Sequence, residues 1–346
     1  MKRVQRSFRQ VVPVVFLVAA FHLSGSSASA GDEEFKWDDS APACGQTSQV
    51  ALKGCQDSAK AGYWLAIGTC YNLSGAAEQE ACLTNTKGNL DSQLNGCKEQ
   101  FNARNEVCRE LGEGLYDPEL ARRGFVKNLR RVTGNLYFPL TPGLFLTYKK
   151  VDPDGNDTNQ RILFDVTNHQ KKILDVTCRA VWNVTRTTEG ELKESTLRWY
   201  AQDGDGNVWI FGEISEQFEQ GLLAGGEGFW SAGLNRAMPG ISMVSDPKNH
   251  QGKAFRQQFY LGKVENVSRI VGMVDKLPVL KKKPRLPDAV HGPYLHVQEF
   301  SPLDPGSLSR PVSRFYAPGV GLVLTISPDG RQEMLVGIEK RLAGVY

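Results

Sequence analysis

The stretch from Cys44 to Cys108 reads CGQTSQVALKGCQDSAKAGYWLAIGTCYNLSGAAEQEACLTNTKGNLDSQLNGCKEQFNARNEVC. It holds six of the seven cysteines of the chain, and these are Cys44, Cys55, Cys70, Cys82, Cys97 and Cys108. Their separations of 11, 15, 12, 15 and 11 residues read the same in both directions. Separations of 11 and 15 residues are roughly three and four turns of an α-helix, so the cysteines of each half fall on one helix face.

This symmetry predicts an antiparallel helical hairpin. Residues at the same height on its two helices have a constant sum of residue numbers, because both helices rise by about 1.5 Å per residue. The pairs that share one sum are Cys44–Cys108, Cys55–Cys97 and Cys70–Cys82. Six cysteines allow about fifteen pairings, but only this nested set fits level rungs between two straight helices. We expect the turn at Asn72–Gln79, where Ser74-Gly75 breaks the helical pattern.

The six thiols could instead bind a soft metal such as copper or zinc. The C-x-x-C pairs that are common in zinc sites are absent, and an oxidising compartment favours disulfides. We therefore expect three disulfides that stabilise a hairpin too small to hold itself together by core burial, and no metal site.

Residues 1–30 have the pattern of a secretory signal peptide, in which basic residues precede an apolar run over residues 11–23 and the segment ends in Ala28-Ser29-Ala30. The run is too short to span a bilayer, so we expect cleavage after Ala30 and no transmembrane segment in the mature chain. Removing the four basic residues of the leader from the 41 of the whole chain leaves 37, against 38 acidic residues. This balance gives no support for nucleic-acid binding. We expect a periplasmic or secreted protein.

Composition divides the mature chain near residues 120–135. We expect a Cys-rich helical hairpin over residues 31–120, a basic linker over 121–134 and an antiparallel β domain over 135–346. The last region consists of short runs rich in Val, Ile, Trp, Tyr and Phe that alternate with Gly and Pro turns, a pattern typical of an antiparallel meander. The predicted fold class is therefore α+β, and a curved sheet, a half-barrel and a closed barrel all remain open.

The sharpest β-hairpin signal runs from Leu197 to Glu213, with Asp205-Gly206 as the turn and Arg198 opposite Glu213. Strand alternation predicts a core face with Leu197, Trp199, Ala201, Val208 and Ile210. The other face combines aromatic side chains with one possible ion pair, and its candidate ligand-binding residues are Arg198, Tyr200, Gln202, Trp209, Phe211 and Glu213. Such a face is either a concave binding surface or a sheet face that another element covers, with the ion pair at its rim.

No catalytic motif stands out. The chain has no nucleophile elbow, metalloprotease or phosphate-loop pattern, and no cofactor motif. Asp203, Asp205 and Asn207 are spaced like the start of a calcium loop, but the required Gly and Glu are missing, so a plain turn is expected. Cys178 lies in a strand pattern and is expected to be a buried free thiol without a partner base.

Several segments resemble an uncharacterised family of bacterial secreted proteins. The resemblance is carried by Phe138–Gly143 with Tyr148, by Trp199–Asp203, Gly206–Glu213 and Gly233–Met243, and by Tyr316–Val323. The sequence departs from the family pattern at Leu146, where an aromatic residue is usual, and at Ile210, where Tyr is usual. The resemblance implies export, a β fold and a Cys-rich helical preface in some members, and it implies no catalytic residue.

Three functions follow from these patterns. The first is a non-catalytic envelope or secreted module that binds an apolar or aromatic-bearing small molecule on the face of Tyr200, Trp209 and Phe211. The second is a hydrolase that uses Asp203, Asp205 or Glu213 as general acid and base. The third is a structural or interaction protein whose helical hairpin docks on an envelope protein.

Overall fold

The structure is a computed structural model, and it describes residues 40–127, 134–226, 228–278 and 285–341. The predicted leader at residues 1–30 lies outside this part, as do residues 128–133 of the predicted linker. Among the residues that are described, no helix combines the length and the apolar character that crossing a bilayer requires.

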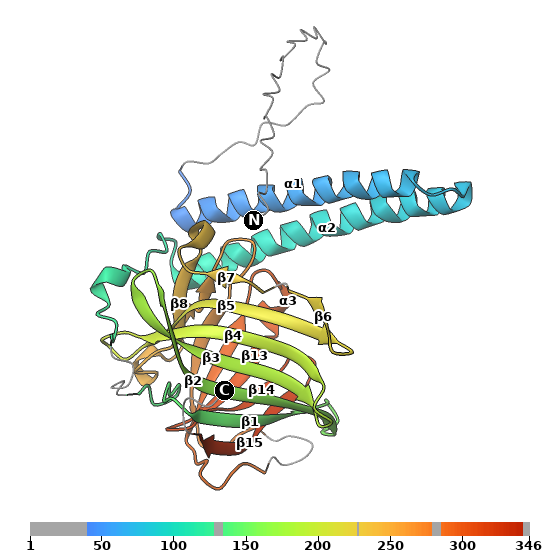
Figure 1. Cartoon of the computed structure of the whole chain (residues 1–346). Helices are drawn as coiled ribbons and strands as arrows, with labels where there is room; N and C mark the ends of the chain where they lie inside the picture. The colour runs from blue at the N-terminus through green and yellow to red at the C-terminus, as the bar shows by residue number, and fades with distance from the viewer. Residues whose placement is uncertain (1–39, 128–133, 227, 279–284, 342–346) are drawn as a thin grey trace, which may run out of the picture. The chain divides into compact units, whose positions relative to one another are not determined.

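Two long helices form the predicted hairpin, α1 (Ala43–Tyr71) and α2 (Ala76–Leu111) (Figure 1). The nested pairing is confirmed, since disulfides join Cys44 to Cys108, Cys55 to Cys97 and Cys70 to Cys82. The Cα–Cα distances of the three bridges are 5.7, 5.8 and 5.6 Å, so the helices keep a constant spacing along their length. The connection is shorter than predicted, because α2 already begins at Ala76, directly after Gly75.

The rest of the described chain is an antiparallel sheet of 15 strands that is nearly closed into a barrel (Figure 1). The strands are β1 (Leu144–Val151), β2 (Asp157–Ile173), β3 (Val176–Thr187), β4 (Leu192–Gln202), β5 (Val208–Glu219), β6 (Leu222–Gly225), β7 (Trp230–Ser231), β8 (Met238–Met243), β9 (Ala254–Arg256), β10 (Gln258–Phe259), β11 (Val267–Val274), β12 (Tyr294–Phe300), β13 (Val312–Ala317), β14 (Gly321–Ile326) and β15 (Gln332–Lys340). Their order is β10-β8-β5-β4-β3-β2-β1-β15-β14-β13-β12-β11-β9, with β6 and β7 paired to β5. The pairing of β1 with β15 joins the first and last strands. The predicted α+β class is thus confirmed.

The two ends of this strand order meet in one short segment of the chain. β9 pairs with β11 and β10 pairs with β8, and only Gln257 separates β9 from β10. The backbone N–H of Gln257 donates to the carbonyl of Asn266 at 2.8 Å. Residues 254–259 therefore contact both edges of the sheet, and few edge groups are left exposed there.

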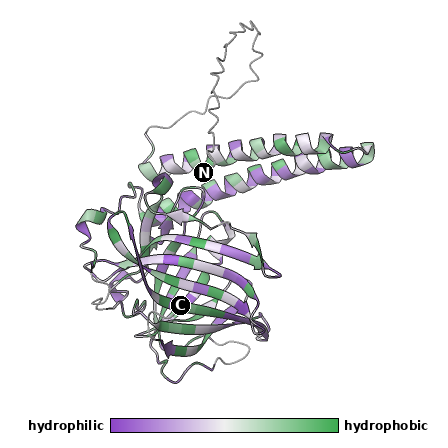
Figure 2. Cartoon of the chain, viewed as in Figure 1, coloured by the Kyte–Doolittle hydropathy of each residue, from purple (hydrophilic) through white to green (hydrophobic). Residues whose placement is uncertain are grey.

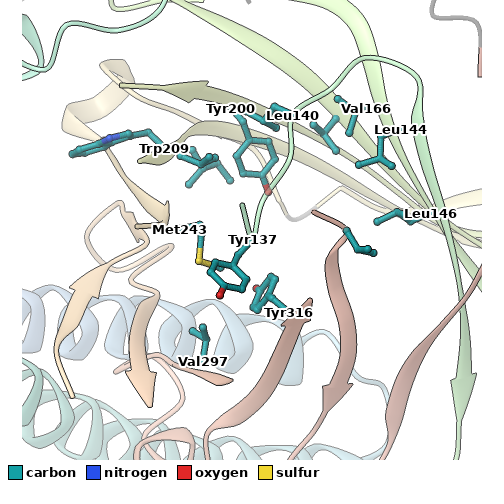
Figure 3. Packing of buried hydrophobic residues seen from close by; sticks show 14 of the residues in the cluster. Tyr137, Leu140, Leu144, Leu146, Val166, Tyr200, Trp209, Met243, Val297 and Tyr316 are labelled. Atoms are coloured by element: carbon teal, nitrogen blue, oxygen red, sulfur yellow. The ribbon is translucent and has the colours of Figure 1, made fainter. Parts of the chain in front are cut away.

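Hydrophilic and hydrophobic residues alternate along most strands, as period-two side-chain alternation requires (Figure 2). One large apolar cluster contains residues from both faces of the sheet and from the segment before β1, including Tyr137, Leu140, Leu146, Trp209 and Met243 (Figure 3). A smaller cluster of Val107, Val267 and Phe300 packs α2 against β11 and β12. The hairpin is thereby attached to the sheet at the end where α2 finishes.

Candidate functional site

A β-bulge in the hairpin of β4 and β5 decides which side chains face the inside of the sheet. Arg198 pairs with Glu213, as the sequence predicts, but Tyr200 pairs with Ile210, so Phe211 is the extra residue on β5. Compared with the predicted unbroken alternation, the bulge exchanges the inner and outer faces of β5 between the turn and Glu213. Ile210 therefore faces the interior, whereas Trp209 and Phe211 face the outer side of the sheet.

The inside of the sheet is a lumen of about 590 Å³. This volume is within the range of about 300–1,000 Å³ that is usual for small-molecule sites. Six aromatic residues line it, and these are Tyr137, Phe138, Tyr148, Phe164, Tyr200 and Tyr316. Nine charged residues also line it, namely Lys150, Glu194, Arg198, Glu213, Lys263, Glu299, Asp304, Arg314 and Glu333. The lumen thus combines flat apolar rings with many groups that form hydrogen bonds.

One wall carries the ion pair between Arg198 on β4 and Glu213 on β5, formed through the Nε of the arginine. Both side chains are largely buried, with exposed fractions of 27% and 17%. Burial disfavours the charged guanidinium, but the nearby Glu213 and Tyr200 outweigh this effect, so the pKa of Arg198 is raised. The two predicted residues therefore lie together and face the lumen.

The strands β12 and β13 supply a second pair of the same kind. The Nε of Arg314 donates to an Oε2 of Glu299 at 2.6 Å, and the other oxygen of Glu299 accepts a hydrogen bond of 2.9 Å from the amide of Gln257. Burial again opposes the charge of Arg314, and Glu299, Tyr316 and Glu333 more than offset it, so its pKa is raised. The charge of Arg314 also acts on the pKa of Arg198, in the lowering direction, as the smallest of the named causes.

Three lumen tyrosines, Tyr148, Tyr200 and Tyr316, are held in the neutral form. Burial raises the pKa of Tyr200 to about 12, although the charge of Arg198 works in the opposite direction. Burial also raises the pKa of Tyr148 and of Tyr316. The hydroxyl of Tyr148 donates to the carbonyl of Leu322 at 3.0 Å, and Figure 3 shows the rings of Tyr200 and Tyr316 extending into the interior from different strands. These phenols are therefore neutral hydrogen-bonding groups at physiological pH.

The other three predicted residues, Gln202, Trp209 and Phe211, lie outside the lumen and are fully buried. The ring of Phe125 packs edge-on against Trp209 and Phe211, at centroid distances of 6.0 and 5.4 Å. The backbone N–H of Val126 donates to the carbonyl of Gln202 at 3.0 Å. Phe125 in the connector after the hairpin thus covers the outer face at Trp209 and Phe211, and Tyr200 lies on the opposite face, so the three predicted rings do not form one surface. The physical reason is the bulge, which places Tyr200 and the other two rings on opposite faces.

The carboxylates of the predicted hydrolase do not converge. Asp203 is buried, and its oxygens accept hydrogen bonds from the backbone N–H of Asn207 at 2.8 Å and from the indole Nε1 of Trp209 at 2.8 Å. Asp205 is exposed in the turn, and Glu213 faces the lumen beside Arg198. Asp203 therefore closes the turn and orients Trp209.

Cys178 is fully buried on β3. Burial raises the pKa of its thiol to about 12, which disfavours the nucleophilic thiolate. Across the described ranges, no group of three or more His, Cys, Asp or Glu side chains is arranged to hold a metal ion.

Sequence reasoning did not identify Glu299, Arg314 or Tyr316 as site residues. The alternation of Arg314 and Tyr316 indicates that both lie on one face of a strand. No local sequence pattern predicts that β13 lies across the lumen from β4. Tyr316 also begins one of the segments that carry the family resemblance. That segment lies beside the one before β1, because Gly319 donates its N–H to the carbonyl of Leu136 at 2.7 Å.

Comparisons with known proteins give little further information. A scan against protein-family models matches no family, and a search of curated proteins finds no match. A search of solved structures finds a candidate lipoprotein from Parabacteroides distasonis, with 11% sequence identity and a TM-score of 0.28. This similarity covers 60% of the present chain and 99% of the other.

Proposed function

We propose that this protein is an exported, non-catalytic binding module that takes a small polar molecule into the lumen of its sheet. The observation that carries the proposal is a cavity of about 590 Å³ into which strands of different walls contribute the Arg198–Glu213 and Arg314–Glu299 pairs. Burying charged side chains costs desolvation free energy, which the ion pairs offset only in part. A cavity with a few well-oriented polar groups is the usual design of a ligand site.

The proposed location is a periplasm or the extracellular space. Three disulfides are the structural support, because such bonds persist in oxidising compartments and are rare in the cytosol. The signal-peptide pattern of residues 1–30 supports the same conclusion. We also propose that the chain belongs to the uncharacterised secreted family that its motifs resemble.

A non-catalytic role is supported by the state of two of the five lumen carboxylates, Glu213 and Glu299. Both oxygens of Glu299 accept hydrogen bonds, and Glu213 is engaged by Arg198. A general acid or base must be free to exchange a proton with the substrate. The engagement of these two carboxylates supports a role in holding a ligand over a role in acid–base chemistry.

A blocking substitution tests this function. Asn183 on β3 lines the lumen, whereas the next residue, Val184, lies outside its lining. Asn183→Trp fills part of the cavity with a residue that strands accept well, and Val184→Trp places the same large side chain on the other face of the strand. Ligand-observed NMR of the oxidised mature chain would use one mixture of neutral, anionic, cationic and apolar fragments.

We expect fragments to bind the wild type and Val184→Trp, and to lose binding in Asn183→Trp at unchanged melting temperature. Equal binding to both variants would contradict the proposal, because the ligand would then lie outside the lumen. Failure of every fragment to bind the wild type would also contradict it.

A second candidate function, docking of the hairpin on an envelope protein, is favoured by the composition of the hairpin tip. Residues 61–77 contain no charged side chain. Within this run Trp64, Leu65 and Tyr71 have exposed fractions of 68%, 77% and 66%. Exposed apolar groups gathered in one place often mark a contact with a partner. The double substitution Trp64→Gln and Tyr71→Gln should then abolish cross-linking to that partner in cells while lumen binding is retained, and unchanged cross-linking would exclude this role for the tip.

A further inference from the structure

The chemistry of the lumen lining restricts the class of ligand it can hold, an inference that rests on the proposed binding function. Four cationic and five acidic side chains line the cavity, so its formal charge is close to balanced. A site that selects a strongly charged ligand normally presents an excess of the opposite charge. The balance therefore disfavours both a multiply charged anion and a cation.

An acyl chain is equally disfavoured. Filling the lumen with hydrocarbon would remove water from nine charged side chains and would offer them no hydrogen bonds in return. Sites for such ligands have linings that are mostly apolar. The ligand must instead supply hydrogen-bonding groups along much of its surface.

The two arginines are positioned to provide such contacts. Each engages its glutamate through Nε. Within the described residues, the terminal Nη1 and Nη2 groups of Arg198 and Arg314 make no further hydrogen bond to protein atoms. A guanidinium fixed in this way presents a planar set of N–H donors in a set direction. Because the paired carboxylate offsets its charge, it can donate to neutral oxygens without requiring an anion.

Aromatic rings supply the second element. The rings of Phe138 and Tyr200 lie 5.0 Å apart between centroids, and Phe138 also packs edge-on against Phe164 at 6.4 Å. The face of an aromatic ring carries partial negative charge and attracts weakly positive C–H groups. A sugar ring presents C–H groups on its faces and hydroxyl groups around its edge, so it matches rings and guanidinium forks together.

We propose that the lumen binds a neutral carbohydrate, an oligosaccharide whose hydroxyl groups engage the Arg198–Glu213 and Arg314–Glu299 pairs while its rings stack on the lining aromatic side chains. The donors of Arg198 and Arg314 contact hydroxyl oxygens. Free lone pairs of Glu213 and Glu299 accept from hydroxyl hydrogens. The neutral phenols of Tyr200 and Tyr316 can do both.

Five probes, three of them neutral sugars and two of other chemistry, test this assignment. Each would be titrated into the oxidised mature chain, and binding would be followed by NMR. Cellotriose, maltotriose and N,N′,N″-triacetylchitotriose are neutral, trigalacturonate is anionic, and decanoate is apolar with one charge. We expect at least one neutral trisaccharide to bind the wild type and to lose binding in Asn183→Trp. The anionic and apolar probes should not bind.

Two conservative substitutions identify the contacts. Arg314→Lys keeps the charge and removes the planar fork, and Glu299→Gln keeps the shape and removes the charge. Each substitution should weaken binding of the trisaccharide by about tenfold or more. The matched control is Arg331→Lys, because Arg331 pairs with Asp329 on the exposed turn before β15, and it should stay within about twofold of the wild type.

Binding of trigalacturonate or decanoate without any neutral sugar would overturn the carbohydrate assignment and leave the lumen-binding function intact. The same holds if only unrelated fragments bind. Equal affinity in Arg314→Lys, Glu299→Gln and the wild type would overturn the assigned contacts. Loss of all binding, in this experiment and in the fragment screen, would overturn both proposals.

Discussion

Arg104 of α2 donates to both carboxylate oxygens of Glu265, through Nε at 3.0 and 3.2 Å and through Nη2 at 2.8 Å. Both side chains are buried, with exposed fractions of 5% and 2%. Glu265 also accepts the backbone N–H of Gly262 at 2.7 Å, and Gln100 of α2 donates to the carbonyl of Leu303 at 3.3 Å. The hairpin therefore holds two loops that contribute lining residues to the lumen.

Arg104→Ala should destabilise the protein strongly. It leaves the carboxylate of Glu265 buried without its partner, which typically costs about 3–5 kcal/mol of unfolding free energy. Urea unfolding measures this loss. Arg122→Ala is the matched control, because Arg122 pairs with Glu119 at the surface, with an exposed fraction of 80%, and such pairs contribute about 0–1 kcal/mol. Equal effects of the two substitutions would contradict the structural role of Arg104.

The cysteine pairing predicts one reactive thiol per chain, and only after unfolding. Six cysteines form disulfides, and Cys178 is buried with a thiol pKa raised to about 12. A disulfide-exchange reagent at neutral pH should therefore not label the native protein without reductant, because thiolate and access are both lacking. In urea it should label one sulfhydryl. Rapid labelling of the native protein, or more than one thiol in urea, would contradict the structure.

The hairpin could be predicted because its information is local and symmetric. The spacing of the cysteines from Cys44 to Cys108 predicts which residues share a helix face and which residues face each other. A disulfide permits only a narrow range of Cα–Cα distances, so few other pairings fit. The same kind of reasoning gave the pairing of Arg198 with Glu213. The helical pairing follows from counting residues along regular elements. The predicted two-residue turn would pair Gln202 with Trp209, but Gln202 pairs with Val208, and the extra residue Phe211 restores the predicted pairing of Arg198 with Glu213.

The lumen could not be predicted in the same way. One extra residue, Phe211, reversed the faces of β5 near the turn, and a bulge leaves no clear mark in a pattern of alternating residues. The Arg314–Glu299 pair comes from strands far from β4 and β5 in the chain, and its position relative to Arg198 depends on how the sheet curves. Sequence reasoning therefore identified one wall of the site and assigned two outer-face aromatic residues to it.

The buried lumen tyrosines predict a loss of stability at alkaline pH. The pKa of Tyr200 is about 12 in the folded protein and 10.0 at the ordinary value, so between these pH values the unfolded chain has released a proton that the folded protein still holds. The unfolded state then binds fewer protons, and the unfolding free energy falls as pH rises through this window. Tyr200→Phe should make the fall less steep by about one proton, as measured by urea unfolding below pH 10 and at several pH values up to about 12. Tyr71→Phe, at an exposed ring of the hairpin tip, is the matched control. An unchanged slope in Tyr200→Phe would show that Tyr200 is not buried as described.

Substitution of Trp209 is the most direct test of whether its sheet face is a covered structural face or a ligand-binding surface. Its side chain has an exposed fraction of 1%, its indole donates to Asp203 at 2.8 Å, and the guanidinium of Arg123 lies 5.2 Å from its ring centroid. Trp209→Ala should lower the unfolding free energy by about 3–5 kcal/mol, as is typical for a large buried aromatic side chain. Trp209→Phe keeps most of the packing and removes the indole donor, so it should cost less while leaving Asp203 one hydrogen bond short.

The matched control is Trp64→Ala, since Trp64 is 68% exposed, and its effect should stay within about 0.5 kcal/mol. Urea unfolding of the three variants measures the costs, and titration with the lumen ligand shows whether Trp209→Phe still binds it. Because Trp209 does not line the lumen, the Trp209→Phe variant should bind the lumen ligand with the affinity of the wild type. A Trp209→Ala protein of normal stability that has lost ligand binding would instead place the ligand on the outer aromatic face, and would displace the lumen as the site.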